Sequence, residues 1–515
     1  MAERQNDMKL GELIRNLPGA VLHGDPDVEI TAVEYDSRRV KPGALFAAVR
    51  GLTNDGRGYI RSAVAAGARA VMADAPLNLD PGVPLILVGD ARSGMTLAAA
   101  EVHGHPAERL IMLGVTGTNG KTTTTYLLES ILDQAGLRSG VVGTVNFRFP
   151  GCTLPAPNTT PEGPDLQYLL ARMVEAGVSH SIMEVSSHAL DLGRVAGCAF
   201  DVAVFTNLTQ DHLDYHGDLE AYFRAKRRLF TEYFSGRRLP GGPRAVVNVD
   251  DERGRGLAAE LGDRVLTVSL RDQADLRPAC FRAERTGLTA RLESPVGPIE
   301  VTSRLLGEIN LYNVLFAAGA ALCLDLDPET IGRGLASSTG APGRLERVGS
   351  RDEYLVLVDY AHTPDALTRS MTVARELKPA RLLTVFGCGG DRDRTKRPLM
   401  GRTAGQLSDL TIITSDNPRT EDPLAIVRQI EAGLNGLKLV RLNPEDLDPG
   451  FKSGTYVALP DRRASIRLAC RVLSPGDILL IAGKGHEDYQ VLGRQKIHFD
   501  DREEARSALE TEGKY

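Results

Sequence analysis

Several features that mark secreted, membrane-spanning or nucleic-acid-binding proteins are absent from this sequence. Its 515 residues contain no run that approaches the roughly 20 apolar residues of a membrane span. The six cysteines form no C-x-x-C pair, which favours free thiols in a reducing cytoplasm. The net charge of −6 gives no sign of a nucleic-acid partner, and residues 1–7 lack the apolar core of a signal peptide. We therefore expect a cytoplasmic protein with neither a membrane span nor a nucleic-acid ligand.

The length and the order of apolar segments predict three α/β domains. A chain of this length is too long for a single hydrophobic core. We expect a small α/β domain at residues 1–106, a central domain at 107–340 and a C-terminal domain at 341–515. Because strand-like and helix-like segments alternate in the second and third regions, we predict a doubly wound, mostly parallel sheet in the centre and a Rossmann-like sheet after it.

A phosphate-binding loop is predicted at the start of the central domain. An apolar run at 110–115 indicates a buried strand, a Gly-rich turn follows, and apolar residues recur at helical spacing through 127–132. In such a turn, Lys121 would reach the outer phosphates of ATP, and Thr122 would offer a hydroxyl to Mg²⁺. The outer glycines are separated by five residues rather than four, so an ordinary helix start is the alternative. The strand-turn-helix context favours an ATP site.

Polar side chains follow other strands of the predicted central sheet, where ligands of such sheets gather. Glu184 ends an apolar strand and could hold Mg²⁺, which prefers oxygen ligands, or could pair with an arginine instead. His212 lies in a polar loop between Asp211 and Asp214, and is either a site residue or a capping or core histidine.

Lys226 is an exception in an otherwise regular amphipathic helix. The apolar stripe runs through Leu219, Tyr222 and Leu229, and Lys226 shares that face. An inward lysine must be paired, neutral or modified, because burial of a bare ammonium group is costly. The alternative is a side chain whose stem is covered while its head reaches water.

The third region contains four apolar strands, each followed by a distinctive loop. These loops lie at 359–362, 387–393, 415–419 and 482–487. They carry charges of both signs, and the guanidinium groups of Arg392 and Arg419 could bind carboxylates while Glu487 accepts from an ammonium group. A zwitterionic ligand would fit this set, although surface ion pairs could produce the same residues.

With these motifs in this order, the chain resembles the Mur ligases over nearly its whole length. Within that family it is similar to the enzymes that add 2,6-diaminopimelate. The family's phosphate loop has the same additional residue as Gly117-Thr118-Asn119-Gly120-Lys121-Thr122. The loop Asp416-Asn417-Pro418-Arg419 resembles its diaminopimelate signature, and lysine-adding relatives usually lack the arginine.

The resemblance implies three groups of binding residues. For the UDP-muramoyl-dipeptide they are Tyr35, Ser37, Leu52, Thr53, Asn54, Asn158, Thr159, Thr160, Ser186 and Arg194. For ATP they are Gly117, Thr118, Asn119, Gly120, Lys121, Thr122, Thr123, Asn310, Asn313, Arg344 and Asp359. For diaminopimelate they are Arg392, Asp416, Asn417, Pro418, Arg419, Gly483 and Glu487. Leu192 is a departure, because relatives often carry a substrate-contacting glutamine there.

The resemblance also implies the metal site and the catalytic residues. Lys121, Glu184, His212 and Lys226 would be catalytic, with Thr122, Glu184, His212 and Lys226 around Mg²⁺. Lys226 would carry a carbamate derived from CO₂, which converts a cation into an anionic metal ligand.

The implied function is ATP-dependent amide ligation in peptidoglycan precursor synthesis. The D-glutamyl carboxylate would attack the γ-phosphorus of ATP, and the amine of meso-2,6-diaminopimelate would then attack the resulting acyl phosphate. His362 is a candidate for the base that takes the proton of the amine, and we expect a monomer. The alternatives are a lysine-adding Mur ligase, a folylpolyglutamate synthetase-like ligase, a P-loop NTPase switch, or an inactive nucleotide-binding regulator.

Overall fold

The computed structural model describes residues 8–51, 54–78, 80–349 and 353–515, so the predicted site residues Leu52 and Thr53 lie outside the described part. The chain divides into two compact units. The first is Met1–Pro278, Leu292–Ile299 and Tyr312–Leu335, and the second is Ala279–Arg291, Glu300–Leu311 and Ala336–Tyr515. The boundaries expected for three domains stay a prediction.

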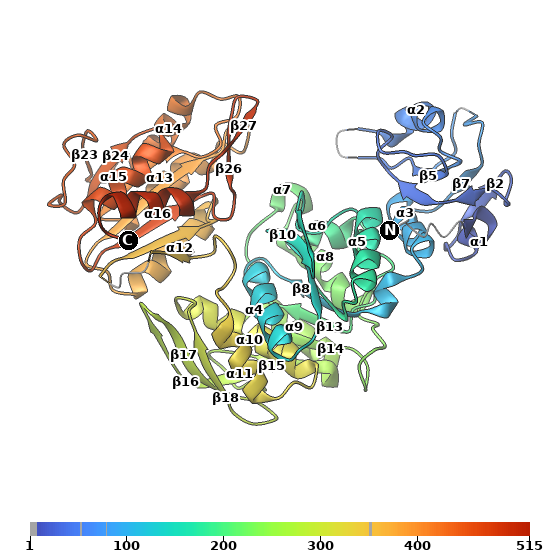
Figure 1. Ribbon diagram of the computed structural model, residues 1–515, viewed down its shortest axis with the longest axis horizontal. Helices are drawn as coiled ribbons and strands as arrows, with labels where there is room; N and C mark the ends of the chain where they lie inside the picture. The colour runs from blue at the N-terminus through green and yellow to red at the C-terminus, as the bar shows by residue number, and fades with distance from the viewer. Residues whose placement is uncertain (1–7, 52–53, 79, 350–352) are drawn as a thin grey trace. The chain divides into compact units, whose positions relative to one another are not determined.

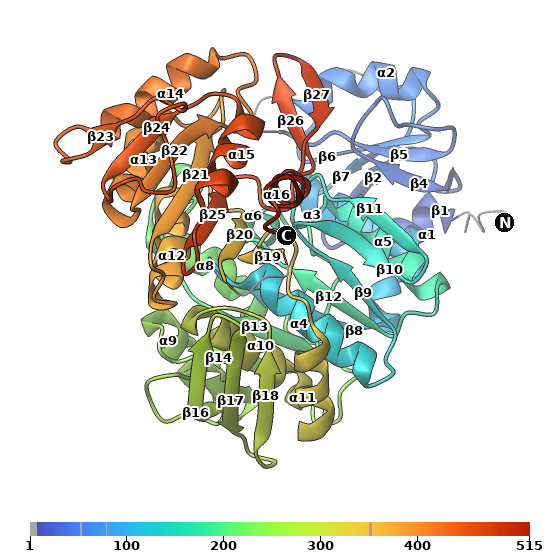
Figure 2. The ribbon, with the colours of Figure 1, turned by 60° about the vertical axis from the view of Figure 1, so that its left-hand side comes forward.

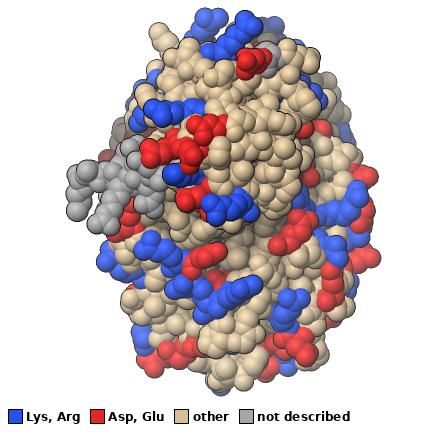
Figure 3. All heavy atoms as spheres, turned by 90° about the vertical axis from the view of Figure 1, so that its right-hand side faces the viewer, with Lys and Arg blue, Asp and Glu red and all other residues tan. Residues whose placement is uncertain are grey.

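Two general expectations concern the whole chain. Every helix in the described ranges is too short or too polar to cross a membrane. On the face shown in Figure 3, Lys and Arg are interspersed with Asp and Glu, without a large area of one sign.

The first unit begins with a five-stranded sheet in the order β2-β7-β6-β5-β4 (Figure 1). Its strands are β2 (Val21–His23), β4 (Ala32–Glu34), β5 (Ala44–Ala47), β6 (Ala70–Ala73) and β7 (Leu85–Leu87). A separate pair is formed by β1 (Met8–Lys9) and β3 (Glu29–Ile30), and the helices are α1 (Leu10–Arg15), α2 (Ile60–Ala65) and α3 (Ala91–Val102). The α/β class expected for this region is confirmed.

The second sheet of this unit has eight strands in the order β11-β10-β9-β12-β8-β13-β14-β15. They are β8 (Ile111–Thr116), β9 (Ser139–Val142), β10 (Asn146–Phe149), β11 (Cys152–Pro155), β12 (His180–Glu184), β13 (Val202–Phe205), β14 (Arg244–Asn248) and β15 (Val265–Val268). From β9 to β15 the pairings are parallel, whereas β10 and β11 are antiparallel additions at one edge. The prediction of a doubly wound, mostly parallel sheet is thus confirmed.

Helices cover both faces of this sheet. They are α4 (Lys121–Gln134), α5 (Gly163–Glu175), α6 (Ser187–Asp191), α7 (Leu213–His216), α8 (Leu219–Thr231), α9 (Glu252–Leu261), α10 (Glu308–Cys323) and α11 (Pro328–Ser337). Side chains of α5, α8 and α9 share one apolar cluster with Ala245 and Val247 of β14. The intervening Val246 faces Gly319 of α10, and α4 runs along β8, β9 and β12 (Figure 2). Coverage on both faces explains why the strands are continuously apolar.

The second unit contains a three-stranded and a seven-stranded sheet. The smaller has the order β16-β17-β18, formed by β16 (Arg277–Glu284), β17 (Gly287–Glu293) and β18 (Ile299–Ser303). The larger has the order β19-β20-β25-β21-β22-β24-β23. Its strands are β19 (Glu346–Val348), β20 (Leu355–Asp359), β21 (Leu382–Cys388), β22 (Leu410–Ser415), β23 (Val440–Arg441), β24 (Thr455–Ala458) and β25 (Ile478–Ala482).

Alternate residues of the larger sheet enter two separate cores. Its helices are α12 (Pro364–Glu376), α13 (Lys396–Leu407), α14 (Pro423–Glu431), α15 (Arg462–Val472) and α16 (Asp501–Thr511), and a hairpin adds β26 (Tyr489–Leu492) and β27 (Gln495–His498). Leu479 and Ile481 of β25 pack with α15 and α16, whereas Ile478 and Leu480 pack with α12, α13 and α14. Because β20, β25, β21 and β22 are parallel neighbours, their carboxyl-end loops emerge at one edge.

Candidate active site

The phosphate loop joins β8 to α4, as the sequence predicts. Gly117 (φ 144°) and Gly120 (φ 91°) adopt backbone conformations that favour glycine. A Cβ atom at Gly117 would lie 1.9 Å from Oγ1 of Thr206, so the close approach itself requires glycine. Lys121 Nζ donates to the carbonyl oxygens of Gly117 and Thr118, both at 2.9 Å.

The end of β13 holds this loop in place. Thr206 Oγ1 donates to Asn119 O at 2.6 Å, and Asn119 N donates to Asn207 Oδ1 at 3.0 Å. Thr123, also expected at the ATP site, is buried in the first turn of α4. Thr206 and Asn207 were not predicted as site residues, although they lie directly after a strand of the predicted sheet.

Glu184 lies beside Thr122, which places two of the predicted metal ligands together. Thr122 Oγ1 donates to Glu184 Oε2 at 2.8 Å. Thr144 donates twice to the same carboxylate, through Oγ1 at 2.9 Å and its backbone N at 2.8 Å. Glu184 is 1% exposed and forms no ion pair with any arginine of the described chain, so the arginine-partner alternative is wrong. Two oxygen-bearing side chains that lie together suit a hard divalent cation.

Lys226 is buried on α8 and faces the phosphate loop. Its side chain is 1% exposed, which excludes the alternative of a head group in water. Nζ donates to Gly117 O at 2.8 Å and lies 4.4 Å from the centre of the Tyr222 ring. Burial, followed by the nearby charge of Lys121, lowers the pKa of Lys226 well below its usual value. Leu219, expected on the same inward stripe, is instead exposed.

His212 is in a different environment from Glu184 and Lys226. It precedes α7 in a left-handed conformation, and its Nε2 lies 3.5 Å from Asp211 Oδ2. Its ring contacts that of His188, with 4.9 Å between centres, and burial lowers its pKa. The described residues contain no cluster of three His, Cys, Asp or Glu side chains that could hold a metal. The role of His212 as a metal ligand therefore stays a prediction.

Three residues expected at the muramoyl-dipeptide form one hydrogen-bonded group. Thr160 Oγ1 donates to the backbone oxygen of Glu184 and accepts from Ser186 N. Arg194 donates to Thr160 O at 3.0 Å and pairs with Glu162 at 2.6 Å, while its buried Nε has no hydrogen-bond partner. Thr159 Oγ1 lies 3.1 Å from Thr144 Oγ1. Asn158 is exposed.

The described residues expected at the uridine nucleotide lie in loops of the five-stranded sheet. Tyr35 Oη donates to Asp165 Oδ2 of α5 at 2.5 Å, and burial, followed by this contact, raises its pKa. Ser37 is half-buried, and Asn54 is exposed. Leu192, the departure from the family pattern, caps the C-terminus of α6, where its backbone N donates to His188 O.

The remaining residues expected at ATP occupy α10 and the start of the C-terminal segment. Asn313 Oδ1 accepts from Thr124 Oγ1 of α4 at 3.5 Å and lies against Gly120, and Asn310 Nδ2 donates to Leu306 O. Asp359 accepts from Leu345 N, Ala361 N and Ser370 Oγ, and burial raises its pKa despite the nearby Arg344.

The loops expected at diaminopimelate meet at the edge of the seven-stranded sheet. Asn417 Nδ2, after β22, donates to Glu487 Oε2, after β25, at 2.9 Å. Arg419 Nη1 donates to Gly390 O at 2.8 Å, and Gly390 N donates to Asn417 O at 2.9 Å. Gly483 has a φ of 117° and lies near the Asp416 carboxylate. Arg392 is exposed and donates only to the oxygen of its neighbour Asp391.

Lys484 is a buried member of this group that the sequence interpretation missed. Its Nζ donates to Asn417 Oδ1 at 3.1 Å and to Tyr489 O at 2.5 Å. Lys484 lies in the loop at 482–487 that the sequence predicts, but the sequence pattern gave no indication that its side chain points inward between acidic residues.

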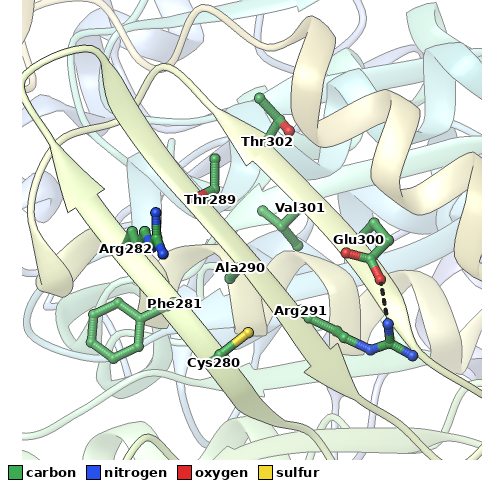
Figure 4. Close-up of a pocket in the computed structure, with 9 residues that line it drawn as sticks. All are labelled: Cys280, Phe281, Arg282, Thr289, Ala290, Arg291, Glu300, Val301 and Thr302. Atoms are coloured by element: carbon green, nitrogen blue, oxygen red, sulfur yellow. Dashed lines mark ion pairs between the residues drawn. The ribbon is translucent and has the colours of Figure 1, made fainter.

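A hollow of about 420 Å³ lies elsewhere, on the three-stranded sheet (Figure 4). It is lined by residues of all three strands, including Cys280, Phe281 and Thr289, and by Arg291 and Glu300, which form an ion pair at 3.2 Å. None of the predicted site residues lines it.

Comparisons with known proteins agree with this geometry. Three family models match: the Mur ligase family catalytic domain at 29–113, the Mur ligase middle domain at 115–321 and the Mur ligase glutamate ligase domain at 343–485. The UDP-N-acetylmuramoyl-L-alanyl-D-glutamate–2,6-diaminopimelate ligase of Geobacter metallireducens is 47% identical over 502 residues, covering 98% of each chain. The enzyme of that name from Gloeobacter violaceus is 48% identical over 507 residues and 98% of each chain.

Solved structures show the same relationship. A structure of an enzyme with this name superposes with a TM-score of 0.70 and 33% identity, covering 98% of this chain and 99% of the other. A Mycobacterium tuberculosis folylpolyglutamate synthase complexed with ADP, at 18% identity and a TM-score of 0.57 over 75% of this chain and 91% of its own, shares the fold. The chain thus belongs to the Mur ligase family and is an ATP-dependent ligase that forms a carbon–nitrogen bond.

Proposed function

We propose that this ligase adds meso-2,6-diaminopimelate to UDP-N-acetylmuramoyl-L-alanyl-D-glutamate in peptidoglycan precursor synthesis. The observation that carries the proposal is the pair of loops after β22 and β25, which bring Asp416, Asn417, Arg419 and Glu487 together. The full-length relatives are named for this reaction. Diaminopimelate carries a carboxylate at its distal carbon where lysine has only hydrogen. A guanidinium group binds that carboxylate and so favours diaminopimelate over lysine.

The nucleotide end of the reaction belongs to the first unit. Lys121 and the N-terminus of α4 would bind the phosphates of ATP, and Thr122 and Glu184 would hold Mg²⁺. Bound magnesium would neutralise negative charge on the transferring phosphoryl group. Thr160, Ser186 and Arg194 would orient the dipeptide so that its carboxylate oxygen bonds to the γ-phosphorus as the bond to ADP breaks.

Lys226 would become a carbamate by reaction with CO₂. The reaction needs a neutral amine, and burial lowers the pKa of Lys226 in the direction that supplies one. The amine nitrogen bonds to the carbon of CO₂ and loses one proton to solvent. The product is an anion beside the phosphate loop, which removes the repulsion that an ammonium group would exert on a metal ion.

The second step would form the amide. The amine of diaminopimelate attacks the acyl phosphate, a tetrahedral intermediate forms, and inorganic phosphate leaves. His362 is the proposed acceptor of the amine proton. Its Nδ1 lies 2.8 Å from Tyr360 O and therefore carries the proton there, and burial lowers its pKa, so Nε2 is free to accept.

The decisive experiment offers diaminopimelate, lysine and ornithine in parallel with ATP, Mg²⁺ and the dipeptide nucleotide. We expect amide formation with diaminopimelate at least about 100-fold more efficiently than with lysine, because lysine leaves Arg419 without a carboxylate partner. Preferential use of lysine would instead identify a lysine-adding Mur ligase, and glutamate addition to a folate would identify a folylpolyglutamate synthetase-like enzyme.

A further inference from the structure

Lys484 is one of the most completely buried charged side chains in the second unit. It is 0% exposed, and an ammonium group in such a place needs compensating charge. Its Nζ lies 3.4 Å from Asp416 Oδ1 and 3.6 Å from Glu487 Oε2. Among the residues that the structure describes, Lys484 alone forms ion pairs with both carboxylates.

The two carboxylates are not equally satisfied. Glu487 Oε2 accepts a hydrogen bond from Asn417 Nδ2 at 2.9 Å. Asp416 is 8% exposed, and its buried Oδ1 accepts no hydrogen bond from any residue that the structure describes, because the contact with Lys484 is not aligned for one. A buried carboxylate oxygen without a donor is costly, so this atom calls for a donor from a ligand.

The charges of this group leave one unit uncompensated. Asp416 and Glu487 contribute two negative charges and Lys484 one positive charge, while the charge of Arg419 is assigned to the carboxylate of the substrate and is left out of this sum. Arg462, which is fully buried beneath the loops, is already paired with Asp501 at 2.6 Å. The remainder of −1 matches one ammonium group of an amino acid.

We propose that Lys484 is a positioning residue of the amino-acid pocket, whose buried ammonium group cancels one of the two carboxylate charges so that Asp416 and Glu487 together receive a single ammonium group of the substrate. This inference rests on the proposed function, because it takes diaminopimelate as the ligand. It assigns Lys484 a role in selecting charge rather than in touching the reacting atoms.

Other ionisable groups around the two carboxylates do not replace Lys484. Arg419 lowers the pKa of Glu487, but it contributes less than Lys484. Burial raises the pKa of Tyr360 and Tyr489 and lowers that of His362, which keeps all three neutral near pH 7. Burial and the charge of Asp416 raise the pKa of Glu487 even with Lys484 present. Without Lys484 the repulsion between the two carboxylates is stronger, and Glu487 binds a proton at higher pH.

The test compares Lys484→Gln, which keeps two hydrogen-bond donors but loses the charge, with Lys484→Arg, which keeps the charge. We expect Lys484→Gln to raise KM for diaminopimelate about 10-fold, equivalent to about 1.4 kcal/mol, while KM for ATP and for the dipeptide nucleotide stays within about twofold. The acidic fall of kcat/KM for diaminopimelate should move upward by about one pH unit, since Glu487 loses the compensating charge of Lys484 and is protonated at higher pH. Lys484→Arg should retain the native pH profile, and Lys438→Met, at an exposed site, is the control.

A double variant keeps the proposal falsifiable if the single variant does not fold. Asp416→Asn with Lys484→Gln removes one charge of each sign and restores the remainder of −1. The acidic limb should return toward its native position, and if Lys484→Gln alone is unfolded, the double variant should be folded. Equal losses for all three substrates, an unchanged pH profile, or a double variant no better than Lys484→Gln would overturn the proposal. Failure of the native protein to use diaminopimelate in the same assay would instead count against the proposed function.

Discussion

Lys226 is an enclosed amine directed at the phosphate loop, and its side chain has no room for a hydrated charge. We expect Lys226→Ala to lower kcat by about 100-fold or more, because the site would lose the proposed carbamate, an anionic group that would stabilise the metal and the transferring phosphoryl group. Formate or acetate should restore part of the rate by replacing the carbamate oxygens. Steady-state kinetics would measure both effects, and ¹³C NMR after addition of labelled bicarbonate would detect the carbamate.

Arg224→Ala is the matched control for Lys226, because Arg224 is exposed on the same helix. Its rate should stay within about twofold of native, as for most surface substitutions. A native rate in Lys226→Ala would remove Lys226 from the site.

Arg419 is the residue that we propose selects the amino acid. We expect Arg419→Ala to raise KM for diaminopimelate about 10- to 100-fold, because loss of a charged hydrogen-bonding partner costs about 1.5–3 kcal/mol. KM for the two nucleotide substrates should change little. Arg419 has a φ of 52°, and alanine meets a similar backbone penalty there, so the change reports the side chain.

Arg428→Ala, at an exposed position of α14, controls for loss of a positive charge in the same region. Initial rates with each substrate varied in turn would supply the three KM values. Equal increases for all three would contradict the assigned role.

Single residues differ in how far the sequence could place them. The helical pattern placed Lys226 inward because its neighbours at 222 and 229 are apolar and buried. The same pattern was wrong for Leu219, which is the first residue of α8 and is exposed, because this end of the helix extends past the hydrophobic core. Lys484 and Thr144 could not be found this way, since Asp416 and Asn417 beside Lys484 and Glu184 beside Thr144 are distant in sequence, and only the folded sheets bring them together.

At the scale of elements, Arg462 connects β22 and β25, the two strands followed by the loops expected at diaminopimelate. Its guanidinium group donates to Ser415 O at the end of β22 and Ala482 O at the end of β25, and it pairs with Asp501 at the start of α16. We expect Arg462→Met to destabilise the second unit by about 3–5 kcal/mol, because it leaves Asp501 buried and unpaired. Urea unfolding followed by circular dichroism would measure the change.

The adjacent Arg463 provides the comparison. It pairs with Glu504 on the same two helices, but its side chain is half exposed. Arg463→Met should lower the free energy of unfolding by about 0–1 kcal/mol, the usual range for surface ion pairs. Similar losses of unfolding free energy in the two variants would show that the buried pair stabilises the second unit no more than the exposed pair does.

The strongly apolar strands were predictable and the weaker elements were not. The four predicted C-terminal strands, which are β20, β21, β22 and β25, lie where the apolar runs placed them, because burial on both faces leaves an uninterrupted signal. The four-residue strands β10 and β11 were missed, since short strands with one exposed face resemble loops. Helix α3 was missed because most of it is buried small residues, which produce no polar face and therefore no helical period.

At the scale of the whole molecule, a ligase and an NTPase switch differ in what ATP turnover requires. We expect phosphate release only when the dipeptide nucleotide and the amino acid are both present, because the acyl phosphate is consumed only by the amine. Release should be at least about 10-fold slower without either one, since water would have to replace a positioned nucleophile. A phosphate-release assay with each substrate omitted in turn measures this dependence.

Full turnover with ATP alone would favour the switch, and no turnover under any condition would favour an inactive regulator. Removal of Mg²⁺ with EDTA should abolish phosphate release in the ligase, and readdition should restore it.

Within the first unit, the N-terminal sheet is connected to the central sheet by ion pairs of Glu162 with both Arg92 and Arg194. Omission of the dipeptide nucleotide from the assay and substitution of Arg194 should therefore impair the same step of the reaction.

The loops that would receive diaminopimelate are tied to one another by the protein itself. Arg397, which is fully buried, donates to Gly389 O and pairs with Glu421, while Gly390 exchanges hydrogen bonds with Asn417 and Arg419. Fixing one residue's backbone costs about 1–2 kcal/mol in conformational entropy, and here that ordering is complete at folding. Binding of the amino acid therefore needs little further ordering of these loops. Calorimetry should find that the ordering of these loops adds only a small entropic penalty to binding.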